Sequence, residues 1–312
     1  MEPAIHLFSE ADLQAIRLLP IRIVDAVEEA IRRQIAGEIR AAPKSGLFPG
    51  DGRYMMTTLS FSDDPPISVV KCVTVCPDNP SNGRPAIDGS IMVHDSRTGA
   101  LRAVMDAKWV TAVRTAALSG LAARRLADPD ATHIGFVGAG VQARAHLDML
   151  AALFPIREVS VYGRGKPNVV RLAEAAREKG LSVAVCADPR AAIAGADIVV
   201  SSVTANTLKA PFLDAGWLKP GAFAASADLG APWRPERLAS LDFVLIDDKE
   251  QEATKTTKLV PDHLVGGDLQ DLVSGRVDVQ HVPARTSAFV FRGIGVGDFA
   301  VAALVLAHAA EA

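Results

Sequence analysis

The stretch GFVGAGVQARAHL, residues 135–147, contains glycines at positions that suit the binding of a dinucleotide. Gly138 and Gly140 follow a short apolar run and precede a segment of helical composition. In a dinucleotide-binding fold the first glycine makes the turn and the second lets pyrophosphate approach the backbone. The third small residue, Ala143, would let the helix pack on the strand while helix N–H groups face the phosphates. The alternative is a purely structural strand-to-helix turn.

Two cations lie in apolar surroundings, where a charge is costly. Lys71, within VVKCV, would share one face of a strand with Val73 and Val75, and a buried ammonium requires an anion or strong hydrogen bonds. Arg114 lies within TAVRTAALSG, where its guanidinium could hold a carboxylate by two hydrogen bonds. The alternatives are a solvated face of an edge strand for Lys71 and a side chain pointing into water for Arg114.

A carboxylate, Asp228, ends the apolar segment GAFAASAD. This is the carboxyl edge of a predicted strand, where doubly wound sheets bind ligands, although an aspartate there can also be a helix cap or a turn former. Together Lys71, Arg114 and Asp228 suggest a small amino or imino acid as substrate. The two cations would bind its carboxylate. Asp228 would exchange a proton with its nitrogen, and a nicotinamide would exchange a hydride with its Cα.

The pattern of predicted helices and strands that must position these residues changes along the chain. The part before residue 107 has an α+β pattern, with a helical segment that Ser9 caps and Pro20 breaks. A strand over residues 67–76 and a hairpin around residues 95–99 follow. A long helix is expected over residues 107–128, capped by Asp106 and ended by Asp128-Pro129.

From residue 133 onward, strand and helix patterns alternate at spacings that favour parallel crossovers. Strands are expected at residues 133–138, 158–163, 182–187, 198–203, 221–228 and 243–248. The fold class is therefore α/β, a Rossmann-type doubly wound domain next to an α+β domain. The apolar helical tail from about residue 293 has few partners in such a sheet and could return to the first domain.

Composition narrows the class of protein. The 312 residues exceed the usual size of one hydrophobic core, which predicts two domains, and the net charge of −3 indicates neither a nucleic-acid nor a membrane partner. The acidic N-terminus lacks the pattern of a secretory signal, and no apolar run is long enough to span a bilayer, so a cytoplasmic protein is expected. The three cysteines are expected to be reduced and buried, and no histidine pair suggests a metal.

The motifs resemble those of the ornithine cyclodeaminase/mu-crystallin family, which includes ketimine reductases and certain amino-acid dehydrogenases. The lysine and RTAA blocks match that family in spacing as well as in type. The resemblance spans most of the chain and is carried by residues 71–127, 137–146, 216–232 and 291–302.

The resemblance implies a substrate-binding and dimerisation domain over residues 1–112, completed by a helix over residues 296–312, and a Rossmann domain over residues 113–295. It implies a homodimer. It also implies that Lys71 and Arg114 bind the substrate carboxylate and that Asp228 handles protons. The cofactor contacts implied are Gly138, Gly140, Val141 and Gln142, with Thr204 on the adenosine side and Gly293 and the substrate contact Ile294 near the nicotinamide.

Several positions depart from the family pattern. Lys44 is the nearest candidate for a further carboxylate-binding arginine, and Ala86 stands in place of a threonine common in cyclodeaminases. Met56-Thr57 replaces a Met-Pro pair, and LGAPWRPERL follows Asp228 in place of a run with proline, glycine, lysine and glutamate. These changes weaken the case for the ornithine reaction in particular.

The expected second strand of the Rossmann domain ends in EVSVYGRGK, which bears on the choice of cofactor. Gly163 occupies the position of the acid that binds the ribose 2′-hydroxyl of NAD, while Arg164 and Lys166 could bind a 2′-phosphate. NADP(H) is therefore predicted to be preferred, with NAD(H) possible. The alternative is an ordinary basic surface turn.

The predicted function is hydride transfer between a nicotinamide cofactor and the Cα of a small amino acid or cyclic imino acid. One alternative is ornithine cyclodeaminase, which converts ornithine to proline and ammonia with NAD+ and no net redox change. The other is a crystallin-like protein that binds NADP(H) without turnover.

Overall fold

The computed structural model describes residues 5–204, 208–277 and 280–311. The chain divides into two compact units. The first consists of Met1–Arg114 together with Gly293–Ala312, and the second is Thr115–Arg292. One helix, α3 (Ala107–Leu126), continues from the first unit into the second.

The first unit contains a sheet in the order β1-β7-β6-β5-β4-β2, with β3 paired to β4. Its strands are antiparallel except for the β1–β7 pair, which is parallel. The bounds are β1 His6–Phe8, β2 Ile39–Ala41, β3 Ser45–Leu47, β4 Tyr54–Asp63, β5 Pro66–Val75, β6 Ile87–Asp95 and β7 Leu101–Asp106, with a 3₁₀ turn, η1, at Asn79–Asn82. The predicted strand β5 and the hairpin of β6 and β7 are confirmed, whereas β4 was not predicted.

The helices of the first unit begin where the capping residues indicate. Ser9 accepts a hydrogen bond from the backbone N–H of Asp12 in a reciprocal capping box at the start of α1 (Glu10–Ala15). Pro20 is the first residue of α2 (Pro20–Ile35), a position where its missing N–H costs no hydrogen bond.

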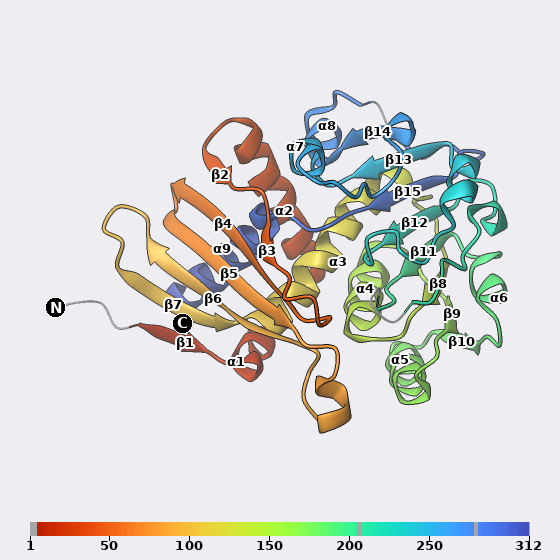
Figure 1. Ribbon diagram of the computed structural model, residues 1–312, viewed down its shortest axis with the longest axis horizontal. Coiled ribbons are helices and arrows are strands. Elements are labelled where there is room, and N and C mark those ends of the chain that lie inside the picture. The colour runs from red at the N-terminus through yellow and green to blue at the C-terminus, as the bar shows by residue number, and fades with distance from the viewer. Residues whose placement is uncertain (1–4, 205–207, 278–279, 312) are drawn as a thin grey trace. The chain divides into compact units, whose positions relative to one another are not determined.

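The apolar tail forms α9 (Gly295–Glu311) and returns to the first unit. It packs on α2, β4 and β5, so that α2 and α9 lie on one face of the sheet (Figure 1).

The second unit contains eight parallel strands in the order β10-β9-β8-β11-β12-β15-β13-β14. Their bounds are β8 His133–Val137, β9 Glu158–Tyr162, β10 Ser182–Val185, β11 Ile198–Ser201, β12 Phe223–Ser226, β13 Phe243–Ile246, β14 Val265–Asp268 and β15 Ser287–Val290. The six predicted strands are confirmed, and with them the doubly wound fold. Two four-residue strands, β14 and β15, were not predicted.

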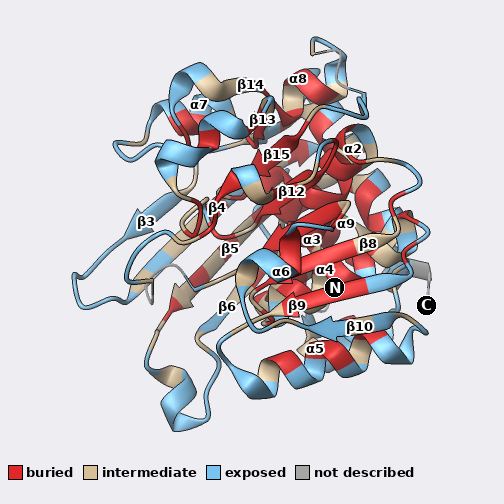
Figure 2. Cartoon of the chain, turned by 90° about the vertical axis from the view of Figure 1, so that its right-hand side faces the viewer, coloured by how far each residue is buried: buried red, intermediate tan, exposed pale blue. Residues whose placement is uncertain are grey.

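Helices accompany the strands of the second unit. Their bounds are α4 Val141–Leu153, α5 Lys166–Glu178, α6 Pro189–Ile193, α7 Lys249–Ala253 and α8 Leu269–Ser274, with 3₁₀ turns η3 Ala215–Trp217, η4 Pro235–Ser240 and η5 Asp262–Leu264. The central strands β8, β11, β12 and β15 are buried along almost their whole length, as expected for a parallel sheet covered on both faces. Figure 2 shows this burial for β8 and β9, beside the partly exposed α5.

The predicted long helix is confirmed as α3, and the carboxylate of Asp106 accepts a hydrogen bond from the backbone N–H of Lys108, 2.7 Å away. The side chains from Arg114 to Ala123 are all buried. Alanine, serine and glycine dominate this stretch, and such small residues let neighbouring backbone approach closely.

The cysteines Cys72, Cys76 and Cys186 are free thiols, each partly exposed, so the predicted burial is wrong. Cys72 alternates with the buried Lys71 on β5, which turns its side chain to the opposite face of the sheet. Within the described ranges no helix has the length and apolar character needed to cross a membrane. The same ranges hold no cluster of three or more histidine, cysteine or acidic side chains placed to bind a metal ion.

Candidate functional site

Lys71 lies in the middle of β5, which pairs with β4 on one side and β6 on the other. Alternate residues of this strand face the interior, and Lys71 is 2% exposed among them. Its Nζ donates a hydrogen bond to Oδ1 of Asp298 over 2.7 Å. The buried alternative is therefore correct, the solvated edge strand is wrong, and the required anion comes from the protein itself.

Arg114 is also buried, with 5% exposure, and does not point into water. Its Nε lies 3.0 Å from Oδ1 of Asp298. Neither Nε nor Nη1 has an aligned hydrogen-bond acceptor among the described residues, although both atoms are excluded from solvent. The guanidinium therefore keeps hydrogen-bond donors available to a ligand.

Gly293 makes room for this guanidinium. Its φ of +90° lies in a region that favours glycine, and a Cβ built on it would lie 2.3 Å from Nη1 of Arg114. The structure therefore places Gly293 against the carboxylate-binding candidate, in the first unit. Its neighbour Ile294 is buried at 7% exposure.

Asp298 is a member of this buried cluster that the sequence patterns above did not identify. It lies in the first turn of α9 and is 1% exposed. Its Oδ2 accepts a hydrogen bond from Oγ1 of Thr58 over 2.8 Å. The criterion that selected Lys71, a charge within an apolar stretch, applies equally to the aspartate of GVGDFAVA and could have found it.

Burial sets the electrostatics of this cluster. Desolvation, followed by the charge of Arg114, lowers the pKa of Lys71 to about 8, although Asp298 opposes the change. Burial by itself would raise the pKa of Asp298, but Lys71 and Arg114 outweigh it and hold that pKa below its ordinary value. The cluster therefore contains two cations and one anion near neutral pH.

Lys44, the candidate for a further carboxylate contact, is half-buried and immediately precedes β3. Ser45, the first residue of β3, pairs with Thr57 of β4. This register places Lys44 near the strand position of Thr58, which contacts Asp298.

In the second unit, the glycine stretch joins β8 to α4 at the point where the chain order of the sheet reverses, since β9 and β11 flank β8. Gly138 has φ +94°, and a Cβ there would lie 2.6 Å from the carbonyl oxygen of Ser202. Gly140 precedes α4 without a side-chain cap, and a Cβ there would meet nothing within 4 Å. The first turn of α4 therefore offers N–H groups beside open space.

Three polar side-chain atoms near this loop are buried and could form hydrogen bonds with a ligand. Oε1 of Gln142, Nη1 of Arg144 and Oγ of Ser202 are buried without a hydrogen-bond partner among the described residues. Val141, in contrast, is 58% exposed at the start of α4. Buried polar groups are normally paired, so the residues present fit a polar ligand such as a dinucleotide. Arg144 and Ser202 were not predicted.

The turn from β9 to α5 carries the residues predicted to choose the cofactor. Arg164 is exposed in this turn, and Lys166 is the first residue of α5. A Cβ on Gly163 would lie 2.9 Å from Cγ2 of Val169, so a carboxylate there would require a local shift. Thr204, predicted to lie on the adenosine side, is exposed beyond the end of β11.

Asp228 follows β12 and is buried at 5% exposure within a hydrogen-bond network. Oδ1 accepts hydrogen bonds from Oγ of Ser226 at 2.7 Å and Oγ of Ser201 at 2.9 Å. Oδ2 accepts from the backbone N–H of Val203 at 3.0 Å. Trp233 donates its indole N–H to Oγ of Ser201 over 3.1 Å, which links the unusual segment after Asp228 to the carboxylate.

Burial raises the pKa of Asp228, although the hydrogen bonds from Ser226, Val203 and Ser201 act against it. The next residue, Leu229, has a φ of +64°, which leucine rarely adopts. Asp228 is therefore a carboxyl group that holds its proton more strongly than usual, followed by a strained turn.

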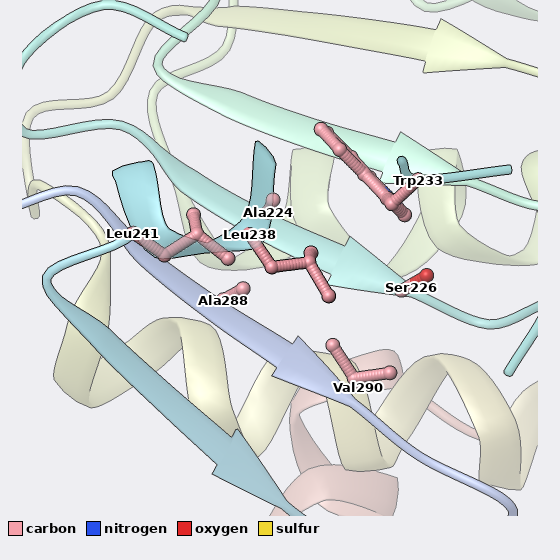
Figure 3. A pocket seen from close by; sticks show the side chains of 7 residues that line it. All are labelled: Ala224, Ser226, Trp233, Leu238, Leu241, Ala288 and Val290. Carbon is pink, nitrogen blue, oxygen red and sulfur yellow. The ribbon is translucent and has the colours of Figure 1, made fainter. Parts of the chain in front are cut away.

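A cavity lies beside this network in the core of the second unit (Figure 3). Its volume is about 10 Å³, and Ser226 is the polar member of an otherwise apolar lining that includes Trp233, Leu238 and Val290. This is about the space of one water molecule, so the cavity can hold neither an amino acid nor a dinucleotide.

Comparisons with known proteins show the family and the fold of this chain. The family model of the ornithine cyclodeaminase/mu-crystallin family matches residues 6–312. Ketimine reductase mu-crystallin of Rattus norvegicus is 30% identical over 245 residues, which cover 75% of this chain and 74% of the relative.

Solved structures share the fold over almost the whole chain. The Thermococcus litoralis Delta(1)-pyrroline-2-carboxylate reductase in complex with NADH and L-proline has a TM-score of 0.91 at 24% identity, covering 98% of both chains. An archaeal alanine dehydrogenase dimer with bound NAD has a TM-score of 0.85 at 23% identity, covering 98% of this chain and 96% of the other. On the family match above all, this chain belongs to the ornithine cyclodeaminase/mu-crystallin family.

Proposed function

We propose that this protein is an NAD(P)-dependent oxidoreductase that acts on the Cα–N bond of a small amino acid or cyclic imino acid, in the direction of imine reduction. The observation that carries the proposal is the buried cluster of Lys71, Arg114 and Asp298, in which Arg114 keeps free donors. The dinucleotide fold of the second unit and the similarity to a ketimine reductase support it.

Lys71 and Arg114 bind the substrate carboxylate. The planar guanidinium offers paired N–H donors that match the two oxygens of a carboxylate, and the ammonium adds a charge-assisted hydrogen bond. Low exposure strengthens both interactions because little water competes for the charges. Lys44 supplies a further positive charge, and Ile294 gives an apolar contact to the substrate.

Gly138, Gly140, Val141 and Gln142 hold the cofactor, with Thr204 on its adenosine side and Gly293 near the nicotinamide. When bound, the reduced cofactor supplies a hydride to the imine carbon. Asp228 donates a proton to the substrate nitrogen, and its raised pKa suits this role because it retains the proton at higher pH than an ordinary aspartic acid.

We further infer that NADP(H) is preferred over NAD(H). Arg164 and Lys166 are two exposed cations at the turn from β9 to α5, and Gly163 puts no carboxylate there to repel a 2′-phosphate. One charge-assisted contact of ~1.5–3 kcal/mol corresponds to a preference of about tenfold or more. Fluorescence titration with NADPH and NADH measures the ratio directly, and equal dissociation constants contradict the preference.

The activity is tested with a panel of imino acids. We expect the purified protein to oxidise NADPH in the presence of Δ1-pyrroline-2-carboxylate or of pyruvate with an amine, and to form the matching amino acid. The assay should include the open-chain imines, because the proposed carboxylate contacts, Lys71 and Arg114, do not specify the side chain of the substrate. No oxidation of either cofactor across the panel refutes the proposal.

Ornithine cyclodeamination is a second candidate, favoured by the buried, proton-retaining Asp228. Here L-ornithine loses its α-amino group as ammonia, the side-chain amine closes the ring, and the product is proline. The unusual segment after Asp228 contacts this residue's network through Trp233, so the altered surroundings count against this reaction. Incubation of L-ornithine with a catalytic amount of NAD+ should yield equal amounts of ammonia and proline, and the absence of both rejects it.

We also infer a homodimer, in which the outward face of the first sheet contacts a second copy. Leu7, Val104, Met92, Val70 and Leu59 lie directly opposite one another across five strands. Leu7 is 74% exposed and Leu59 is 49% exposed, so this apolar row is not covered within the chain. An uncovered apolar row of this extent is typical of a protein interface.

A further inference from the structure

The carboxylate of Asp298 joins three elements of the first unit around one point. Oδ1 lies 2.7 Å from Nζ of Lys71 on β5 and 3.0 Å from Nε of Arg114 on α3. Oδ2 lies 2.8 Å from Oγ1 of Thr58 on β4. Because one carboxylate contacts both cations and is itself held by Thr58, it determines where each cation lies.

The charges of this cluster do not balance. Two cations and one anion, each 5% exposed or less, leave one net positive charge in a place from which water is excluded. A buried charge without a partner is strongly unfavourable, so the cluster attracts one further anion. Nη1 of Arg114, buried without a hydrogen-bond partner, is the atom that such an anion would meet.

We propose that Asp298 is the positioning residue of the carboxylate site: it aims Lys71 and Arg114 and reduces the charge of the site to +1, so that one carboxylate of the substrate neutralises it. This inference rests on the proposed function. It gives Asp298 a role in substrate binding in addition to the roles proposed for Lys71 and Arg114. Without Asp298 the two cations would repel each other at short range, and neither would have a fixed direction.

The proposal predicts how binding depends on pH. The charged groups that face Lys71 are Arg114 from α3 and Asp298 from α9, while its neighbours on the adjoining strands, Thr58 and Ile91, do not titrate. Asp298 raises the pKa of Lys71, and Arg114 lowers it. Removal of the carboxylate charge therefore lets Lys71 lose its proton at lower pH than about 8, the wild-type value.

Two variants separate charge from position. Asp298→Asn keeps the shape but removes the negative charge, so the loss of affinity with rising pH should begin at least one pH unit lower than in the wild type. At pH 8 this is a loss of about fivefold, and it approaches about tenfold at higher pH, since one unit of pKa is a factor of ten in the protonation equilibrium. Thr58→Val removes the hydrogen bond that holds Oδ2 and leaves the charges intact, so affinity should fall at every pH without a shift of the profile.

The measurement is calorimetric titration of the full-length protein, saturated with NADP+, with pyrrole-2-carboxylate as a planar carboxylate probe from pH 5.5 to 9.5. Asp197→Asn is the matched control. Asp197 immediately precedes β11 and therefore lies at the amino ends of the parallel strands, whereas the glycine loop lies at their carboxyl ends. Its partly buried carboxylate forms an ion pair with Lys219 and accepts hydrogen bonds from the backbone N–H groups of Thr132 and His133. The control should bind the probe as the wild type does. NADPH affinity and melting temperature verify the fold of each variant.

An unchanged pH profile in a folded Asp298→Asn overturns the inference, as does wild-type affinity in Thr58→Val. If Asp298→Asn does not fold, Thr58→Val and the pH profile of the wild type still test the inference. A wild-type affinity that does not fall above pH 8 also overturns it. A wild type that binds the probe as described but reduces no imine refutes the proposed reaction and leaves the role of Asp298 supported. A wild type that does not bind the probe at any pH overturns the role of Asp298.

Discussion

Each charged or ionisable side chain buried in the candidate site has polar partners within the protein that fix its position. Lys71 and Arg114 share the carboxylate of Asp298, and Asp228 receives three hydrogen bonds in the other unit. A buried charge that loses one partner is destabilised by several kcal/mol, on the order of 3–5. Single substitutions at these residues should therefore act on function through position and charge together, and the conservative variants are the informative ones.

Gly293→Ala should weaken carboxylate binding tenfold or more. The new Cβ would lie 2.3 Å from Nη1 of Arg114, so the guanidinium must move away from its present position. Loss of one charge-assisted hydrogen bond, ~1.5–3 kcal/mol, accounts for that magnitude. The readout is the dissociation constant of pyrrole-2-carboxylate by calorimetry.

Gly275→Ala is the control for backbone strain. Its φ of +72° is also left-handed, but a Cβ there meets no atom within 4 Å. Both variants should lose about 1–2 kcal/mol of stability through the backbone alone. If the two weaken binding equally, contact with Arg114 is not the cause.

Asp228→Asn should abolish most turnover while leaving the protein at least as stable at pH 7. The folded-state pKa lies above the ordinary value of 3.8, so the folded protein binds more protons than the unfolded chain between these two values. The stabilising contribution of Asp228 is thus present at low pH and is lost as pH rises through the folded pKa. An asparagine carries no charge and avoids that loss.

Turnover of this variant should fall by about 10²–10⁴-fold, the usual contribution of a general acid. Steady-state rates and melting temperatures measured from pH 4 to 8 give both quantities. Unchanged turnover would remove Asp228 from the reaction. A melting temperature well below that of the wild type at pH 7 would show that its hydrogen bonds outweigh its burial.

At the scale of elements, the sheet order of the second unit places the glycine loop and the β9–α5 turn on neighbouring strands. β8 and β9 are adjacent and parallel, so their carboxyl ends lie at the same edge. The loop after β8 and Arg164 after β9 can therefore contact one extended dinucleotide. The adjacency of β8 and β9 supports the proposed contact of Arg164 with the cofactor.

Arg164→Ala should reduce the preference for NADPH over NADH about tenfold or more, mainly by weakening NADPH binding. Arg177→Ala, an exposed arginine in the last turn of α5, is the matched control and should change neither affinity. Fluorescence titration of both cofactors on the three proteins supplies the ratios. The same ratio in Arg164→Ala as in the wild type would assign this arginine to an ordinary surface turn.

At the scale of the whole molecule, the apolar helix α9 packs within the first unit and does not supply the exposed apolar row. Val296, Val301 and Val305 are fully buried, and the helix packs on α2, β4 and β5 within the first unit. The hairpin of β6 and β7, in contrast, contributes Met92 and Val104 to the exposed apolar row. A hollow of about 520 Å³ opens on the same sheet near Arg40, Leu59 and Val70.

Val70→Glu should therefore convert a dimer into a monomer. The substitution puts a charge in the middle of the apolar row, where a second copy would have to bury it without a partner. Light scattering should give twice the chain mass of 32.8 kDa for the wild type and the single chain mass for the variant. Val170→Glu, at an exposed position of α5, should leave the mass unchanged. A monomeric wild type contradicts the dimer.

The sequence by itself determined most of the elements and most of the candidate residues. The alternation of strand and helix from residue 133, the helix start at Ser9 and the hairpin near residue 95 are local patterns, and local hydrogen bonding and side-chain periodicity produce them. Lys71 and Arg114 stood out because a charge in an apolar stretch is unusual wherever it occurs in a chain.

Only the tertiary structure decided what those charges contact. Asp298 lies 227 residues from Lys71 in the chain, and the return of α9 to the first unit brings them to 2.7 Å. The position of β15 between β12 and β13 and the link from Trp233 to Ser201 are likewise long-range. The burial of the Lys71 side chain depends on the central position of β5 in its sheet, because the neighbouring elements that pack on a residue decide whether it is buried.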